Sequence, residues 1–113
     1  MPLLELTTNT NIDDQQHIAQ QASKLTAQIL GKPESYVMVK IMPAQTLIFA
    51  GTDEPAAHVK LNSLGLPENN TAELSSKICA FISENLNISS ARIYIEFSSP
   101  ERHMWGWDNR TFL

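Results

Sequence analysis

The strongest constraint on the fold is an order of elements that occurs twice along the chain. Runs of apolar and β-branched residues predict strands at residues 3–7, 37–42, 57–61 and 92–97. A stretch with helical periodicity lies between the two strands of each half, residues 1–50 and 51–100. A helix between two strands favours parallel pairing through a right-handed crossover, with both helices on one face of the sheet. The predicted fold class is α+β with α/β-type crossovers, built as two repeated β-α-β units around a four-stranded sheet.

The helical stretches are defined by their apolar stripes and by their ends. Asp13 or Asp14 is suited to cap the first helix, Gly31 suits the left-handed position after its last turn, and Pro33 prevents its continuation. Asn69, Asn70 or Thr71 can cap the second helix. The apolar stripes recur at spacings of three and four, and consist of Ile18, Ala22, Leu25 and Ile29 in the first helix and Leu74, Ile78, Phe81, Ile82 and Leu86 in the second.

The second face of the sheet and the connecting segments carry further predictions. Residues 37–42 and 92–97 have sizeable apolar groups on both sides, so we expect an apolar second face that a small chain covers by oligomerising. Residues 47–50 are expected to form an additional short strand. The segment 98–113 fits no helical period and contains Trp105 and Trp107; it is either a docked extension with aromatic anchors or the wall of a small-ligand pocket.

Composition excludes several classes of function. A length of 113 residues predicts one domain, and 42% hydrophobic with 18% charged residues is typical of a globular protein. The net charge of −4 argues against a nucleic-acid partner. No apolar run is long enough to span a membrane and no signal peptide is evident, so a cytoplasmic location is expected. The single cysteine, Cys79, permits no intrachain disulfide and is expected to be buried and inert.

The amino terminus carries the first candidate for catalysis. Met1 precedes a small residue and is expected to be trimmed, which leaves Pro2 as a terminal secondary amine anchored by the strand behind it. An α-amino group titrates near pH ~8, and burial or a nearby cation lowers its pKa, so the amine could act as a general base near neutrality. The alternative is that Pro2 only begins an edge strand, where its missing N–H costs nothing.

The motifs together resemble the family of macrophage migration inhibitory factor and D-dopachrome tautomerase, within the tautomerase superfamily that uses an amino-terminal proline. The resemblance covers nearly all of residues 1–113. It is carried by Met-Pro at residues 1–2, Gly-Lys-Pro at 31–33 with Tyr36, Gly-Thr-Asp-Glu-Pro at 51–55, Asn-Ser-Leu-Gly at 62–65, Arg-Ile-Tyr-Ile at 92–95, and Gly-Trp-Asp-Asn at 106–109 followed by Thr-Phe at 111–112. It implies a homotrimer whose three sheets form a barrel, with three sites at the subunit boundaries.

The resemblance also implies roles for individual residues. Pro2 would be the general base, moving a proton between carbon and oxygen of a small aromatic 2-keto acid such as phenylpyruvate without a cofactor. Lys32 would bind the substrate carboxylate, whereas without the family it would be read as a solvated lysine at a helix end. Ser63 and Leu64 match a loop that contacts substrate and would otherwise be an ordinary turn. The remaining aromatic positions are Tyr36, Trp107 and Phe112 at the mouth of the site and Tyr94 from the adjacent subunit.

Two positions depart from the family pattern. Residues 56–59 read Ala-Ala-His-Val where better-known members have a Cys-x-x-Cys pair, so dithiol oxidoreductase chemistry is not expected and His58 is interpreted as structural. No metal-ligand spacing is present. Glu96 stands where the inhibitory factors have asparagine. A carboxylate in the site could pair with Lys32, repel an anionic substrate or raise the pKa of the Pro2 amine, and each effect predicts a working but poorer tautomerase.

Two classes of function therefore remain open at this stage. The first is a keto–enol tautomerase with Pro2 as its base, favoured because Pro2, Lys32 and the aromatic residues occur together. The second is a cytokine-like interaction protein with a vestigial pocket and a protein receptor, for which the absence of a signal peptide is no obstacle because this family is known for unconventional secretion. A structural oligomer with no ligand is the third and weakest reading.

Overall fold

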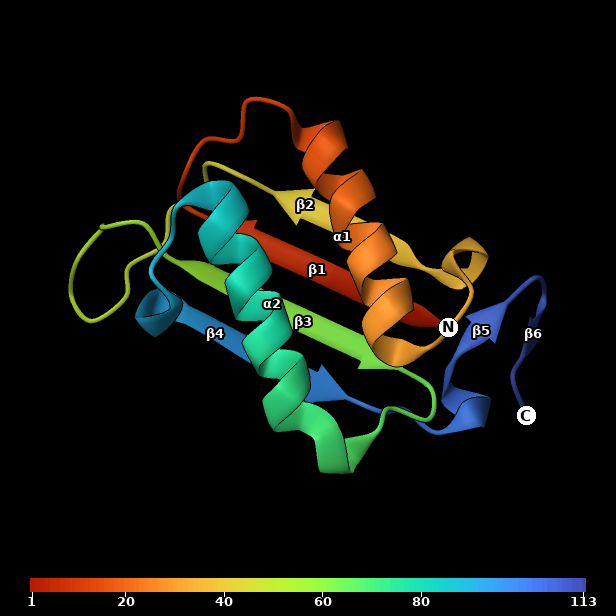
Figure 1. Cartoon of the computed structure of the whole chain (residues 1–113). Helices are drawn as coiled ribbons and strands as arrows, with labels where there is room; N and C mark the ends of the chain where they lie inside the picture. Colours follow the sequence, from red (N-terminus) through yellow and green to blue (C-terminus); the bar gives the residue numbers. More distant parts are fainter.

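The four main strands form one mixed sheet in the order β2-β1-β3-β4 (Figure 1). The computed structural model describes residues 1–113 and places β1 at Pro2–Thr8, β2 at Met38–Met42, β3 at Ala57–Ser63 and β4 at Ile93–Ser98. β1 pairs with β2 in parallel, β3 pairs with β4 in parallel, and β1 and β3 run antiparallel down the middle. The two β-α-β units thus meet along β1 and β3, and the predicted fold class is confirmed.

Both helices cover the same face of this sheet (Figure 1). α1 spans Gln15–Leu30 and α2 spans Thr71–Leu86. Asp14 caps α1 by accepting a hydrogen bond at Oδ1 from the backbone N–H of His17 at 3.0 Å. Gly31 follows α1 in the left-handed region with φ 63°, as predicted, and ends the helix immediately before Lys32.

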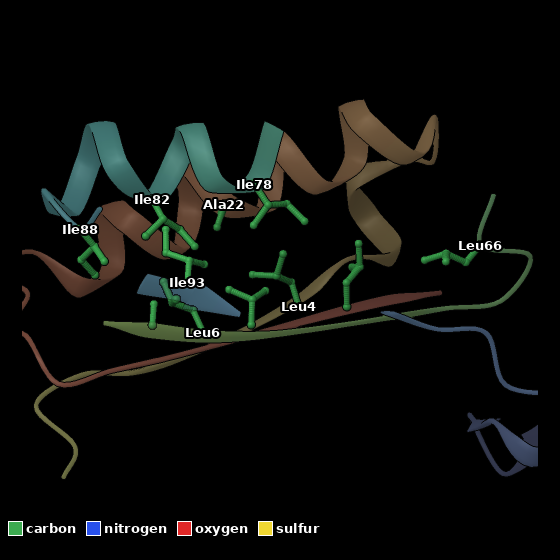
Figure 2. Close-up of a cluster of buried hydrophobic side chains, with 11 residues drawn as sticks. Leu4, Leu6, Ala22, Leu66, Ile78, Ile82, Ile88 and Ile93 are labelled. Carbon is green, nitrogen blue, oxygen red and sulfur yellow. The ribbon is translucent and has the colours of Figure 1, made fainter. Parts of the chain in front are cut away.

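The core lies between the helices and the inward side of the sheet (Figure 2). Alternate residues of the two central strands point toward the helices because side chains of a strand alternate between its faces. Its innermost members are at most 1% exposed: Leu6, Ala22, Val59, Leu61, Ile78, Ile82 and Ile88. Burying each of the larger aliphatic groups contributes about 1.5–3 kcal/mol, so this layer holds the helices against the sheet.

The open face of the sheet corrects the prediction of an apolar surface. Met38 and Tyr94 are both 66% exposed there, but a charged row crosses all four strands. Lys40, Glu5, Lys60 and Glu96 are register partners in that order, so positive and negative charges alternate from β2 to β4. Lys40 Nζ lies 3.7 Å from Glu5 Oε1. The face therefore carries both exposed apolar side chains and a charged row, so it is apolar only in part.

Residues 47–50 do not form the expected strand. Phe49 and Thr52 instead exchange two backbone hydrogen bonds of 3.0 and 3.1 Å around Ala50 and Gly51, whose φ values of 54° and 76° are those of a tight type I′ turn. The turn limits the pairing to a single bridge. Cys79 is also less buried than expected, since it lies at the margin of the core and is half-buried.

The carboxyl-terminal segment folds into a small hairpin beside the start of β1 (Figure 1). A 3₁₀ turn at Arg102–Met104 leads into β5 at Gly106–Trp107, which pairs antiparallel with β6 at Arg110–Thr111. Asp108 and Asn109 make the two-residue turn with φ values of 50° and 64°, a region that these residue types tolerate better than most. Neither helix of the chain is both long and apolar enough to cross a membrane.

Candidate active site

A cavity of about 430 Å³ opens where the amino terminus, the end of α1 and the carboxyl-terminal hairpin meet. Four segments far apart in the sequence contribute to it: the terminus, the connection from α1 to β2, the loop after β3, and the last twelve residues. The lining residues are Met1, Lys32, Pro33, Tyr36, Leu64, Gly65, Arg102, Trp107 and Phe112. The lining contains two cations and the terminal amine, but no carboxylate side chain.

Lys32 is held in place by the end of β3. Its Nζ donates a hydrogen bond of 3.0 Å to Ser63 Oγ and a second one to the carbonyl oxygen of Leu64. Ser63 is buried, and its position is fixed because it pairs with Pro2 across the central strands. An ammonium group has three protons: two of them anchor the lysine, and the third is directed to the Met1 amine, so that removal of Met1 would leave it for a ligand in the cavity. The backbone carbonyl of Leu64 thus supports Lys32.

The terminal amine lies beside this lysine. Burial lowers the pKa of the Met1 α-amino group below its ordinary value, and the charge of Lys32, a hydrogen bond with Lys32 and the charge of Arg102 lower it further. All of these effects favour the neutral amine, since desolvation and neighbouring cations both oppose protonation. Pro2 is less than 2% exposed directly behind Met1. Removal of Met1 would expose the Pro2 nitrogen at this end of the cavity.

The opposite wall is aromatic and is built by the hairpin. The rings of Trp107 and Phe112 stack with centroids 6.0 Å apart and an interplanar angle of 12°. The Phe112 backbone N–H donates to the carbonyls of Arg102 and Trp105 at 3.1 and 3.2 Å, which holds the chain end against the 3₁₀ turn. Tyr36, 49% exposed, also lines the cavity. A flat apolar wall beside cationic groups is suited to an aromatic or conjugated anion.

This arrangement belongs to a known structural class. The family model described as "Macrophage migration inhibitory factor (MIF)" matches residues 1–113. The macrophage migration inhibitory factor homolog of Trichuris trichiura is 35% identical, over 99% of this chain and 100% of that protein. The crystal structure of the homologue from Prochlorococcus marinus superposes with a TM-score of 0.93 at 34% identity, covering 97% of this chain and 98% of that one. The structure of the macrophage migration inhibitory factor from Trichinella spiralis superposes with a TM-score of 0.92 at 33% identity, covering 97% of this chain and 99% of that one.

The chain belongs to the macrophage migration inhibitory factor family. The resemblance inferred from the sequence motifs is confirmed, and the match extends over the whole α+β unit together with the hairpin that closes the cavity. Five of the residues predicted from the family pattern line this one cavity: Lys32, Leu64, Tyr36, Trp107 and Phe112. Pro2 and Ser63 lie immediately behind its lining, paired with each other across β1 and β3.

The two other predicted residues of the macrophage migration inhibitory factor pattern lie elsewhere in the chain. Tyr94 and Glu96 project from the open face of β4. Tyr94 packs against Phe49 with ring centroids 4.7 Å apart, and Glu96 contacts His58 Nε2. The pairing of Glu96 with Lys32 that the sequence suggested is therefore not made within one chain.

Sequence reasoning missed one charged residue of the site. Arg102 lines the cavity, and its Nε donates to the Phe112 carbonyl at 2.8 Å. The sequence gives little indication of this role, because Arg102 lies before the recognisable Gly-Trp-Asp-Asn motif. It reaches the site only when the hairpin folds back. Met1, Pro33 and Gly65 complete the lining. No group of three or more His, Cys, Asp or Glu side chains is arranged to hold a metal ion.

Proposed function

We propose that this protein is a cofactor-free keto–enol tautomerase of the phenylpyruvate type, with Pro2 as its general base and acid once Met1 is removed. The observation that carries the proposal is a cavity at the amino terminus that holds Lys32 and no carboxylate side chain, where burial and Lys32 lower the pKa of the Met1 α-amino group; the Pro2 amine would become the terminal amine of this end of the chain. A neutral amine near pH 7 can accept a proton, and its conjugate acid can return it. The macrophage migration inhibitory factor family includes phenylpyruvate tautomerase activity.

The proposed reaction needs only one group that moves a proton. In the direction from enol to keto, the Pro2 nitrogen takes the proton of the enol hydroxyl, and the protonated amine then delivers a proton to the adjacent carbon. No proton is gained or lost overall, and no redox step occurs. Lys32 would bind the substrate carboxylate with the proton that Ser63 and Leu64 leave free. The stacked Trp107 and Phe112 rings would contact the aromatic ring of the substrate.

We further propose that the protein acts as a homotrimer with sites at its subunit boundaries. Tyr94 and Glu96 face away from the cavity of their own chain, on the open sheet face, where a neighbouring subunit could receive them. In that arrangement Glu96 adds a negative charge near an anionic substrate, which supports the expectation of modest activity.

The function can be tested with the same chain prepared with and without Met1. Retained Met1 makes the Pro2 nitrogen an amide, which has no basicity, so phenylpyruvate tautomerisation is expected only from the trimmed chain. Equal activity of the two preparations would remove Pro2 as the base. Absence of activity in the trimmed chain would favour the alternative of a cytokine-like interaction protein with a vestigial pocket.

A further inference from the structure

We infer that Arg102 is a specificity-determining residue, and that the cavity takes 2-keto acids with a second anionic group at the end of the molecule remote from the keto acid. The inference rests on the proposed tautomerase function and names its substrate class. It starts from the part of the cavity that one chain supplies, which is lined by Lys32 and Arg102 together with the terminal amine and contains no acidic side chain of the same chain. A substrate with one carboxylate would leave one of the two cations without a counter-ion.

Arg102 is free to bind such a group. Its Nε is occupied by the Phe112 carbonyl at 2.8 Å, but its two terminal nitrogens make no hydrogen bond within the chain. The neighbouring carboxylate of Glu101 does not neutralise it, because Glu101 Oε2 lies 3.4 Å from His103 Nδ1 and forms no ion pair with Arg102. The terminal nitrogens of a guanidinium are two parallel donors whose geometry matches a carboxylate or a phosphate.

The backbone fixes where this guanidinium sits. The Phe112 backbone N–H donates to the Arg102 carbonyl at 3.1 Å, and the Phe112 carbonyl accepts from Arg102 Nε. Both the backbone and the side chain of Arg102 are therefore bonded to Phe112 of the aromatic wall. Lys32 is anchored independently on Ser63 and Leu64 at the end of β3. The two cations therefore come from separate elements and are held by separate contacts. Both charges also lower the pKa of the terminal amine.

Two binding points imply a substrate with two anionic groups. The 2-keto carboxylate would lie at Lys32, the planar or conjugated body would lie against Trp107 and Phe112, and a carboxylate at the far end would lie at Arg102. Lys32 contributes one remaining proton, whereas Arg102 contributes both terminal nitrogens, so the second contact is the more directional one.

The experiment compares 4-carboxyphenylpyruvate with phenylpyruvate, using trimmed wild-type protein, Arg102→Gln and Arg102→Lys. The preference is the ratio of kcat/KM for the two substrates measured at the same pH in each variant, so an effect of Arg102 on the pKa of the terminal amine acts on both substrates and leaves the ratio unchanged. We expect the wild type to favour the doubly charged substrate in kcat/KM by about tenfold or more. Arg102→Gln should lower kcat/KM for the doubly charged substrate far more than for phenylpyruvate and so abolish the preference, and Arg102→Lys should keep part of it.

Lys24→Gln is the matched control, because Lys24 is an exposed lysine of α1 outside the cavity and its loss changes the net charge equally. Equal losses on both substrates in Arg102→Gln would mean that Arg102 only supports the hairpin, and the inference would be wrong. A wild type without preference would also overturn it. If neither substrate is turned over, the proposed function fails, and calorimetric binding of 4-carboxycinnamate against cinnamate still decides whether Arg102 selects a second carboxylate.

Discussion

Replacing Lys32 by glutamine is the perturbation that separates the charge of this residue from its structural contacts. In the wild type, Nζ donates to Ser63 Oγ at 3.0 Å and to the Leu64 carbonyl. A glutamine amide can still donate to these acceptors from a similar position, so Lys32→Gln is expected to fold with the loop after β3 intact. What it loses is the positive charge facing the cavity.

The expected loss of activity follows from the number of donors. With two of its three protons held by Ser63 and Leu64, Lys32 gives the substrate carboxylate a single charge-assisted hydrogen bond. Such a bond contributes about 1.5–3 kcal/mol net. At 1.4 kcal/mol for each factor of ten, kcat/KM for phenylpyruvate should fall roughly 10- to 100-fold. A loss of several thousandfold would exceed what one bond can supply.

The charge has a second effect, on pH dependence. Activity requires the neutral amine, so kcat/KM falls as the pH drops through the pKa of that group. Lys32 lowers the pKa of the Met1 amine, and the same positive charge should lower the pKa of a Pro2 terminus at this end of the cavity, so removal of the charge should move the acidic limb of the profile to higher pH. The assay is phenylpyruvate tautomerisation across pH 5–9 by trimmed wild type, Lys32→Gln and the control Lys24→Gln. An unchanged kcat/KM together with an unmoved acidic limb in Lys32→Gln would refute the reasoning.

Two further predictions concern a residue of the open sheet face and the core. Glu96→Asn should raise phenylpyruvate turnover about threefold, the scale of one exposed charge interaction, and a variant no faster than wild type would remove Glu96 as the cause of modest activity. Ile78→Ala should lower the free energy of unfolding by about 2–5 kcal/mol in urea titration, since Ile78 is 1% exposed between α2 and the sheet. Glu84→Ala, at an exposed position of the same helix, should change it by less than about 0.5 kcal/mol.

The sequence predicts the layered fold well because the spacing of apolar residues along a helix or strand indicates which face is buried. Ala22 and Ile78 lie on the apolar stripes and are both buried against the sheet. Gly31 ends α1 where its conformational freedom is needed. Periodicity says less about polar residues on the same side: Thr26 is also buried in α1, because its hydroxyl donates to the Ala22 carbonyl at 2.7 Å.

The sequence-based predictions are wrong or incomplete where the structure depends on a turn conformation or on contacts between residues far apart in the sequence. The positive φ values of Ala50 and Gly51 convert an apparent strand into a tight turn, a choice that the apolar residues around them do not reveal. The polarity of the open face depends on the register of four strands, which aligns Glu5 with Lys40 and Lys60. Arg102 enters the cavity only through the fold of the hairpin, and no local pattern marks it.

The most direct test of the account is the phenylpyruvate tautomerisation rate of the Met1-free chain and of Pro2→Gly, after intact mass has confirmed that Met1 is absent. The account predicts a wild-type rate well above that of buffer and its loss in Pro2→Gly, because glycine removes the rigid secondary amine of the residue that pairs with Ser63 across the central strands. A trimmed wild type that is no faster than buffer, or a Pro2→Gly variant as fast as the wild type, would contradict the central role of the amino-terminal proline.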